Sequence, residues 1–278
     1  MTVADYYCEF YPRKDLLTRQ AIQFKQKDEY FSSYFVSRQN MLEWFSLTNE
    51  NEAKDLAAKM LADRAKTKSL QFAPNEIELF FANLPPIKEY KRLFGSYTKA
   101  CETASVPLMF NGKLPKEWPN DFSKRKIMID TREQRPLEFA NRESLKLDIG
   151  DYSTIGADYT NTFVDRKSFS DWCGTLVNEN FDRFRREVIR AKTQDCFLWV
   201  VIDCRMEDVY DLSKQARHKP NISYISHNMR ILQQEFSQHL QFLFSGGREN
   251  SQVIIPKLLC LGKDAWNVDM QYFLGGQL

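Results

Sequence analysis

Three aspartates and one lysine near the middle of the chain have types and spacing that suit metal-dependent chemistry. Asp130, Asp151 and Asp165 each follow a short apolar run, and Lys167 comes two residues after the last of them. Short runs rich in β-branched and aromatic residues are typical of strands. A carboxylate at the tip of a buried strand is costly unless it is paired or binds a metal. The pattern therefore predicts a divalent-metal site, and its oxygen ligands favour Mg²⁺ or Mn²⁺.

The order of these residues resembles a known nuclease plan. Gly150-Asp151 is followed by Asp165-Arg166-Lys167 and then by Asp171. This order is similar to the PD-(D/E)XK plan and, more narrowly, to the G-D…E-R-K-x-x-x-D signature of the XPF family of structure-specific DNA endonucleases. The resemblance covers residues 126–262 and includes DTRE at 130–133, GTL at 174–176 and RFRRE at 183–187. One departure is that Asp165 stands where the family has a longer Glu.

The resemblance implies a role for each charged residue. The three aspartates would be the metal ligands, and Lys167 would orient the attacking water and stabilise charge in the transition state. Glu133 would position a second ion or a water, while Arg132 and Arg166 would grip phosphate oxygens in two places. The implied catalytic set is Asp130, Glu133, Asp151, Asp165, Arg166 and Lys167. The implied DNA-binding set is Arg132, Asp171, Arg183, Arg186 and Arg190.

Each of these residues also has an ordinary structural interpretation. Taken alone, Asp130 is typical of a strand-end turn, Gly150-Asp151 of a hairpin turn, and residues 165–167 of a charged edge strand. Their combined order along the chain favours the nuclease interpretation. For the arginines between 183 and 190, the sequence leaves a DNA-backbone surface and a solvated helix face equally open.

The second half of the chain must supply the elements that position these side chains. Strand patterns cover 126–131, 145–149, 152–155, 162–166, 197–202 and 240–244, and helix patterns cover 168–177, 181–193, 207–214, 226–238 and 248–261. This alternation predicts an α/β fold, a central mixed sheet flanked by helices, which matches the PD-(D/E)XK nuclease core. Residues 263–278 are expected to form a C-terminal tail.

Residues 1–120 predict a mostly helical accessory region. An amphipathic helix is expected over 50–66, another after Pro74, and a third over 88–104. The Pro, Gly and Asn content of 107–119 is typical of a linker. Basic and aromatic residues between 88 and 99 leave open whether this region contacts substrate or presents an ordinary solvated face.

Composition is that of an ordinary globular protein, with 278 residues, 27% charged residues and a formal net charge of +2. Affinity for nucleic acid must therefore come from local patches. No run approaches the roughly 18 apolar residues of a membrane helix, and the N-terminus lacks a signal-peptide pattern. We expect a protein that is not secreted and is cytoplasmic or nucleoid-associated, or nuclear in a eukaryote. The six cysteines form no C-x-x-C pair and predict free thiols rather than a zinc site.

The sequence predicts a metal-dependent endonuclease that prefers branched or flapped DNA. Two alternatives stay open: a catalytically silent DNA-binding partner of an active nuclease, and a restriction-type enzyme in which residues 1–120 read a DNA sequence. The presence of Asp151 and Lys167 argues against the silent partner. A homodimer through the nuclease domain is also expected, because the apolar positions in 222–232 and 253–259 exceed one inward-facing stripe.

Overall fold

The computed structural model describes residues 37–114 and 125–275 and divides the chain into two compact units, Met1–Met109 and Phe110–Leu278. The sequence placed this boundary after residue 120. Residues 1–36 of the predicted helical region and 115–119 of the predicted linker lie outside the described residues.

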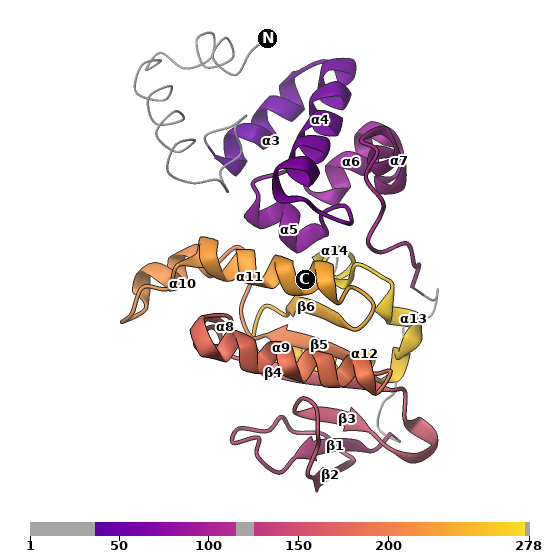
Figure 1. Ribbon diagram of the computed structural model, residues 1–278, viewed down its shortest axis with the longest axis vertical. Helices are drawn as coiled ribbons and strands as arrows, with labels where there is room; N and C mark the ends of the chain where they lie inside the picture. Colours follow the sequence, from indigo (N-terminus) through magenta and orange to yellow (C-terminus); the bar gives the residue numbers. More distant parts are fainter. Residues whose placement is uncertain (1–36, 115–124, 276–278) are drawn as a thin grey trace. The chain divides into compact units, whose positions relative to one another are not determined.

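The described part of the N-terminal unit is helical (Figure 1), with α3 (Arg38–Leu47), α4 (Glu50–Lys68), α5 (Glu76–Phe81), α6 (Ile87–Phe94) and α7 (Tyr97–Thr103). Four of these helices begin at a residue whose side chain accepts a hydrogen bond from the first turn: Ser37, Asn49, Asn75 and Ser96. The helix predicted over 88–104 is divided because Gly95 adopts a left-handed φ of +80°, which ends α6.

A mixed sheet of six strands forms the centre of the C-terminal unit, and it confirms the predicted α/β class. The strands are β1 (Ile127–Asp130), β2 (Arg142–Leu145), β3 (Tyr152–Thr154), β4 (Thr162–Lys167), β5 (Phe197–Ile202) and β6 (Leu240–Phe244). Their order is β2-β1-β3-β4-β5-β6. Strand β3 is antiparallel to β1 and β4, whereas the pairs β1–β2, β4–β5 and β5–β6 are parallel.

One face of the sheet packs against α12 (Arg248–Leu261), α13 (Lys263–Trp266) and α14 (Met270–Gly275). Alternate strand residues supply this core, as expected for a period of two: Ile127, Ile129, Tyr152, Val164, Trp199, Val201 and Leu243. The predicted C-terminal tail is therefore wrong over its described part. Met270 and Leu274 are buried in this core, so residues 263–275 belong to the fold.

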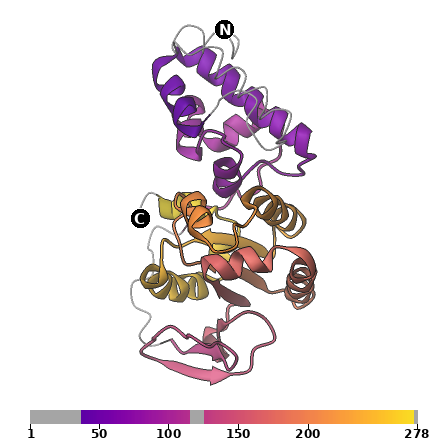
Figure 2. The same ribbon diagram turned by 90° about the vertical axis from the view of Figure 1, so that its left-hand side faces the viewer.

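The opposite face carries α8 (Phe169–Thr175), α9 (Asn178–Thr193) and α11 (Ile222–Glu235), with α10 (Val209–Gln215) leading into α11. Trp172 of α8 packs edge-on against Phe244, and Phe184 of α9 contacts Phe242. Figures 1 and 2 show helices on both sides of the sheet around β4–β6. Strand β2 is Arg142–Leu145 rather than the predicted 145–149, because the chain after Leu145 leaves the sheet as a loop.

Most of the apolar residues that suggested a dimer are buried within one chain. Ile222, Ile225, Met229 and Leu232 of α11 are buried, as are Ile254, Ile255, Leu258 and Leu259 of α12. Only part of the set remains accessible, with Tyr224 44%, Ile231 38% and Val253 56% exposed. The homodimer stays a prediction. Within the described residues, no helix has the length and apolar character needed to cross a membrane.

Candidate active site

The three predicted aspartates form a row at the neighbouring strands β1, β3 and β4, with Asp151 directly before β3. In the printed register Ile129 pairs with Tyr152, and Tyr152 pairs with Val164. Extending each pair by one residue brings Asp130 opposite Asp151 and Asp151 opposite Asp165. The backbone agrees, because the Asp130 N–H donates to the Asp151 carbonyl at 2.8 Å. Residues opposite one another on antiparallel strands share a face, so the row lies on the α8–α9 side of the sheet.

Gly150 makes the tight approach of β3 to β4 possible. Its φ is +59°, and a Cβ at this position would lie 2.8 Å from the Val164 carbonyl oxygen. Any other residue would therefore be strained and would also clash with backbone. The next residue, Asp151, donates its N–H to the same carbonyl at 2.7 Å. Gly150, the first residue of the Gly-Asp pair that the sequence singled out, is thus required for the register.

Asp165 and Lys167 lie on the same face of β4 because they are two residues apart. Asp165 is buried, and its Oδ2 lies 2.8 Å from the Lys167 Nζ. The ammonium also lies over the ring of Phe184, 5.6 Å from its centroid. Burial alone would lower the pKa of Lys167, but the carboxylates of Asp165, Asp151 and Glu187 outweigh it and raise the pKa. The lysine is therefore held as a cation.

The surroundings of Asp151 disfavour the ionised form of its carboxyl group. Burial, followed by the negative charge of Asp165, raises its pKa well above the ordinary value. Glu133 adds to this effect, whereas Lys167 and the backbone N–H of Arg166, which donates to Asp151 Oδ2 at 2.8 Å, oppose it. The carboxylates of Asp151 and Asp165 thus share one face with Lys167.

Glu187 of α9 completes this group, although it was absent from the predicted site. Its Oε1 accepts a hydrogen bond from the Gly150 N–H at 3.0 Å, and burial together with Asp165 raises its pKa. The sequence held one signal, because the resemblance places an acid at this position of the helix. Periodicity could not show that this residue of α9 reaches the β3 turn.

Asp130, which the sequence predicted to be a metal ligand, is bound in the structure by donors of the chain itself, and its role in metal binding stays a prediction. Its Oδ1 accepts from the Nε of Arg132 at 2.8 Å, and its Oδ2 accepts from the Nη2 of Arg132 at 2.9 Å and from the Leu147 N–H at 2.7 Å. Burial opposes ionisation, but these donors outweigh it and lower the pKa. The carboxylate is thus engaged in holding the loop after β2. Arg132 is likewise occupied, since its Nη2 also donates to the Leu147 carbonyl at 2.6 Å.

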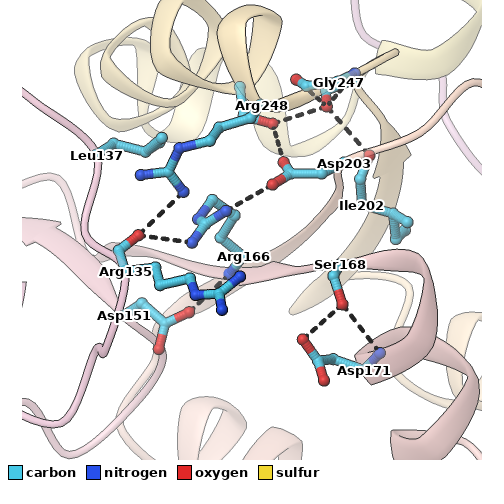
Figure 3. A network of polar contacts seen from close by, with 12 residues as sticks. Arg135, Leu137, Asp151, Arg166, Ser168, Asp171, Ile202, Asp203, Gly247 and Arg248 are labelled. Carbon is cyan, nitrogen blue, oxygen red and sulfur yellow. Dashed lines mark hydrogen bonds and ion pairs between the residues drawn. The ribbon is translucent and has the colours of Figure 1, made fainter.

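Arg166 lies on the opposite face of the sheet from Asp165 and Lys167, and its predicted contact with phosphate stays a prediction. Figure 3 shows its guanidinium between Asp203 and Arg135. It donates to Asp203 Oδ2 at 2.5 Å and to the Arg135 carbonyl at 2.8 Å, and Asp203 in turn accepts from Ser251 of α12. Arg248 reaches the same Arg135 carbonyl at 3.0 Å. Arg166 therefore joins β4, β5, α12 and the loop after β1.

Glu133 connects the two faces of the site. Its Oε1 accepts the Arg135 N–H at 2.7 Å and lies 3.4 Å from the Nη2 of Arg166. Its charge also acts on Asp151. Glu133 is therefore placed beside the carboxylate row but is held by the arginine network.

A polar cleft of about 360 Å³ adjoins the carboxylates, between the end of β4 and helices α8 and α9. Residues at its wall include Lys167, Asp171, Gly174, Asn180, Arg183 and Glu187. Two members of the predicted DNA-binding set, Asp171 and Arg183, thus lie here. Asp171 accepts a hydrogen bond from the Ser168 hydroxyl at 2.6 Å in the cap of α8 (Figure 3). Arg186 and Arg190 are exposed on α9 and are not at this wall.

The donor set on this face suits a divalent cation of the Mg²⁺ type. Within 37–114 and 125–275, no three His, Cys, Asp or Glu side chains come together as a complete metal site. Mg²⁺, however, is usually bound through one or two carboxylates together with waters and substrate phosphates. Asp151 and Asp165 match that mode, and their mutual repulsion with Glu187 would be relieved by a cation.

No protein-family model matches the chain, and no curated protein matches it. Among solved structures, XPF from Aeropyrum pernix is similar at a TM-score of 0.37 and 18% identity, covering 50% of this chain. The same protein in complex with DNA gives 0.36 and 16%, covering 49%. This chain spans 66% and 64% of those two chains, less than two thirds of each. At these values, function has to be inferred from the residues of the site itself.

Proposed function

We propose that this protein is a metal-dependent endodeoxyribonuclease of the PD-(D/E)XK type, using Mg²⁺ or Mn²⁺. The observation that carries the proposal is the arrangement on one face of β3 and β4. Asp151 and Asp165 are opposite one another, and the Lys167 ammonium is 2.8 Å from the second carboxylate. Two carboxylates and a lysine, next to a polar cleft, form a set suited to phosphodiester hydrolysis.

Each residue of the site would have a separate role in the reaction. Asp151 and Asp165 would hold a divalent ion, which would supply charge neutralisation at the phosphate and a water of lowered pKa. Lys167, kept cationic by its neighbours, would stabilise the negative charge that develops on the phosphate oxygens. Asp165 also orients the lysine through their ion pair. Glu187 would hold the Gly150 turn, and with it Asp151, in place.

Preference for branched or flapped DNA is supported by the resemblance of the motifs to the XPF family. Contacts to phosphate position a protein on DNA without reading its sequence. Structure-specific recognition is therefore the form of selectivity that we propose.

A catalytically silent DNA-binding protein is the second candidate, and one observation favours it. The Lys167 ammonium is already bound to Asp165, and the Asp130 carboxylate is bound by Arg132. A site locked in this way would bind DNA without cutting it. The two candidates differ in a single measurement, cleavage in the presence of metal.

The deciding experiment incubates purified protein with labelled duplex, single strand, flap and four-way junction, with Mg²⁺, with Mn²⁺ and with excess EDTA. We expect cleavage of flap or junction with metal and none with EDTA. Asp165→Asn should abolish cutting, whereas Asp148→Asn, in an exposed loop of the same unit, should retain it. Full activity in EDTA, or in Asp165→Asn, would contradict the proposal. Binding of the branched DNA without any cutting would favour the silent partner.

A further inference from the structure

A polar cleft lies beside the carboxylates of the site. It has a volume of about 360 Å³ and includes Lys167 and Glu187 in its wall. Sites for small ligands begin at roughly 300 Å³. The cleft is therefore large enough for one compact polar unit, and whatever lies in it is next to the proposed reaction centre.

The arginines of α9 are not equivalent with respect to this cleft. Arg183 is at its wall, and among the described residues its guanidinium has no ion pair or hydrogen bond. Arg185, two residues further on, is bound to Glu235 at 3.0 Å and is not at the wall. The structure thus leaves Arg183, and not Arg185, available to an anion in the cleft.

The remaining wall is polar but not simply basic. Asp171 and Glu187 are acidic, and Asn180 donates from its Nδ2 to the Gly174 carbonyl at 3.0 Å, which fixes the orientation of its amide. A bare phosphate would find two carboxylates in the same cleft. A nucleotide suits it better, because its phosphate pairs with a cation while its sugar and base carry hydrogen-bond donors and acceptors.

We propose that this cleft holds one nucleotide of the bound DNA strand next to the scissile phosphate, with the phosphate of that nucleotide against Arg183. The inference rests on the proposed function, because it assigns a position for the strand that the carboxylates would cut. Arg183 acts as a positioning residue, since it holds the strand and does not contact the reacting atoms.

Gly174 offers a steric test of the cleft. A Cβ added at this glycine meets no atom within 4 Å, and its φ is not in the left-handed region. Because Gly174 is at the wall of the cleft and its Cβ would lie in open space, a side chain can be added there without strain in the backbone. Gly174→Ala should leave most of the space and keep the wild-type melting temperature, since Ala is favoured over Gly in a helix. Gly174→Leu should fill the space that the nucleotide needs.

The experiment measures binding of a fluorescein-labelled flap DNA to the full chain in EDTA at several salt concentrations, followed by cleavage with Mg²⁺. Arg183→Gln should weaken binding about threefold to tenfold and reduce the slope of log Kd against log salt by about 0.7–0.9, the value for one lost phosphate contact. Arg185→Gln removes the same charge from the same helix and should change Kd less than twofold, because Arg185 is paired with Glu235 and is not at the cleft wall. Gly174→Leu should weaken binding about tenfold, and Gly174→Ala should not.

Each outcome either supports or contradicts the proposed position of the nucleotide in the cleft. Loss of affinity in Arg183→Gln and Gly174→Leu, with melting temperatures like the wild type and with both controls unaffected, supports the cleft. Wild-type affinity in Gly174→Leu, or equal losses in Arg183→Gln and Arg185→Gln, overturns it while leaving the proposed nuclease intact. If cleft variants lose binding but no protein cuts with metal, the nuclease proposal fails and the cleft stands. No binding of flap DNA by the wild type would overturn both.

Discussion

The Gly150 N–H donates to the Glu187 carboxylate at 3.0 Å, so the turn that begins β3 is fastened to α9. This contact links the position of Asp151 to a helix that starts 27 residues later in the chain, with Asn178 as its first residue. Burial and the charge of Asp165 raise the pKa of Glu187, and the hydrogen bond from Gly150 offsets part of this effect because it favours the charged carboxylate.

Two substitutions of Glu187 separate the effect of its hydrogen bond to Gly150 from the effect of its negative charge. Glu187→Ala removes the acceptor and leaves a buried N–H unpaired, which should cost about 1–3 kcal/mol of unfolding free energy. Glu187→Gln keeps an amide oxygen as acceptor and removes the repelling charge, so its stability should match or exceed that of the wild type. Urea denaturation in EDTA measures both. Equal losses in the two variants would mean that the charge, not the hydrogen bond, stabilises the turn.

Removal of one carboxylate from the row should stabilise the metal-free protein. Asp151→Asn relieves repulsion with Asp165 and Glu133, so its melting temperature in EDTA should rise by a few degrees. Addition of Mn²⁺ should raise the melting temperature of the wild type through ligand binding, and that of the variant much less. Asp148→Asn is the matched control and should behave as the wild type. A lower melting temperature for Asp151→Asn in EDTA would contradict the electrostatic account.

Asp165→Glu tests whether the shorter side chain limits the choice of metal. Mg²⁺ demands near-ideal octahedral geometry, with bonds of about 2.0–2.1 Å, so a short carboxylate should penalise it more than Mn²⁺. The variant should therefore raise the Mg²⁺ cleavage rate relative to the Mn²⁺ rate under single-turnover conditions. An unchanged ratio would show that the reach of Asp165 does not matter.

Asp130 should matter for stability rather than for metal binding. Asp130→Ala leaves the buried Leu147 N–H without its acceptor and should cost about 1–3 kcal/mol at pH 7. The folded-state pKa of Asp130 is lowered, so its contribution is present above the ordinary pKa of 3.8 and is lost as the pH falls through the lowered value. The difference between wild type and variant should therefore narrow below about pH 4. A difference that is the same at pH 3 and pH 7 would exclude ionisation as the cause.

Arg166 should prove structural rather than a phosphate contact. Its guanidinium is buried with Asp203, and removal of one partner from such a pair typically costs about 3–5 kcal/mol. Arg166→Met should thus lower stability while leaving the salt dependence of DNA binding unchanged at a temperature where the variant is folded. A smaller salt slope, like that expected for Arg183→Gln, would instead assign Arg166 to phosphate.

The sequence predicted most of the strands of the sheet, because a strand shows as a local pattern of apolar residues. The strands that end at or contain Asp130 and Asp165 follow from short apolar runs, and Gly150 predicts the turn that precedes β3. It failed where partners come from distant segments. Arg166 and its partner Asp203 are 37 residues apart and meet across β4 and β5, which no spacing rule shows. The helices after residue 263 were missed because each is short, and only the sheet makes Met270 and Leu274 core residues.

The alternation on β4 also limits how this protein can change over evolutionary time. Asp165 and Lys167 face one side and Arg166 faces the other, so a one-residue insertion or deletion inside the strand would exchange the two sides at once. The lysine would then lie among the partners of Asp203, and the arginine would lie beside the carboxylates. Substitutions can accumulate separately on either side of the strand, whereas changes of length are confined to the loops at its ends. Length in this strand should therefore be inherited more strictly than residue identity.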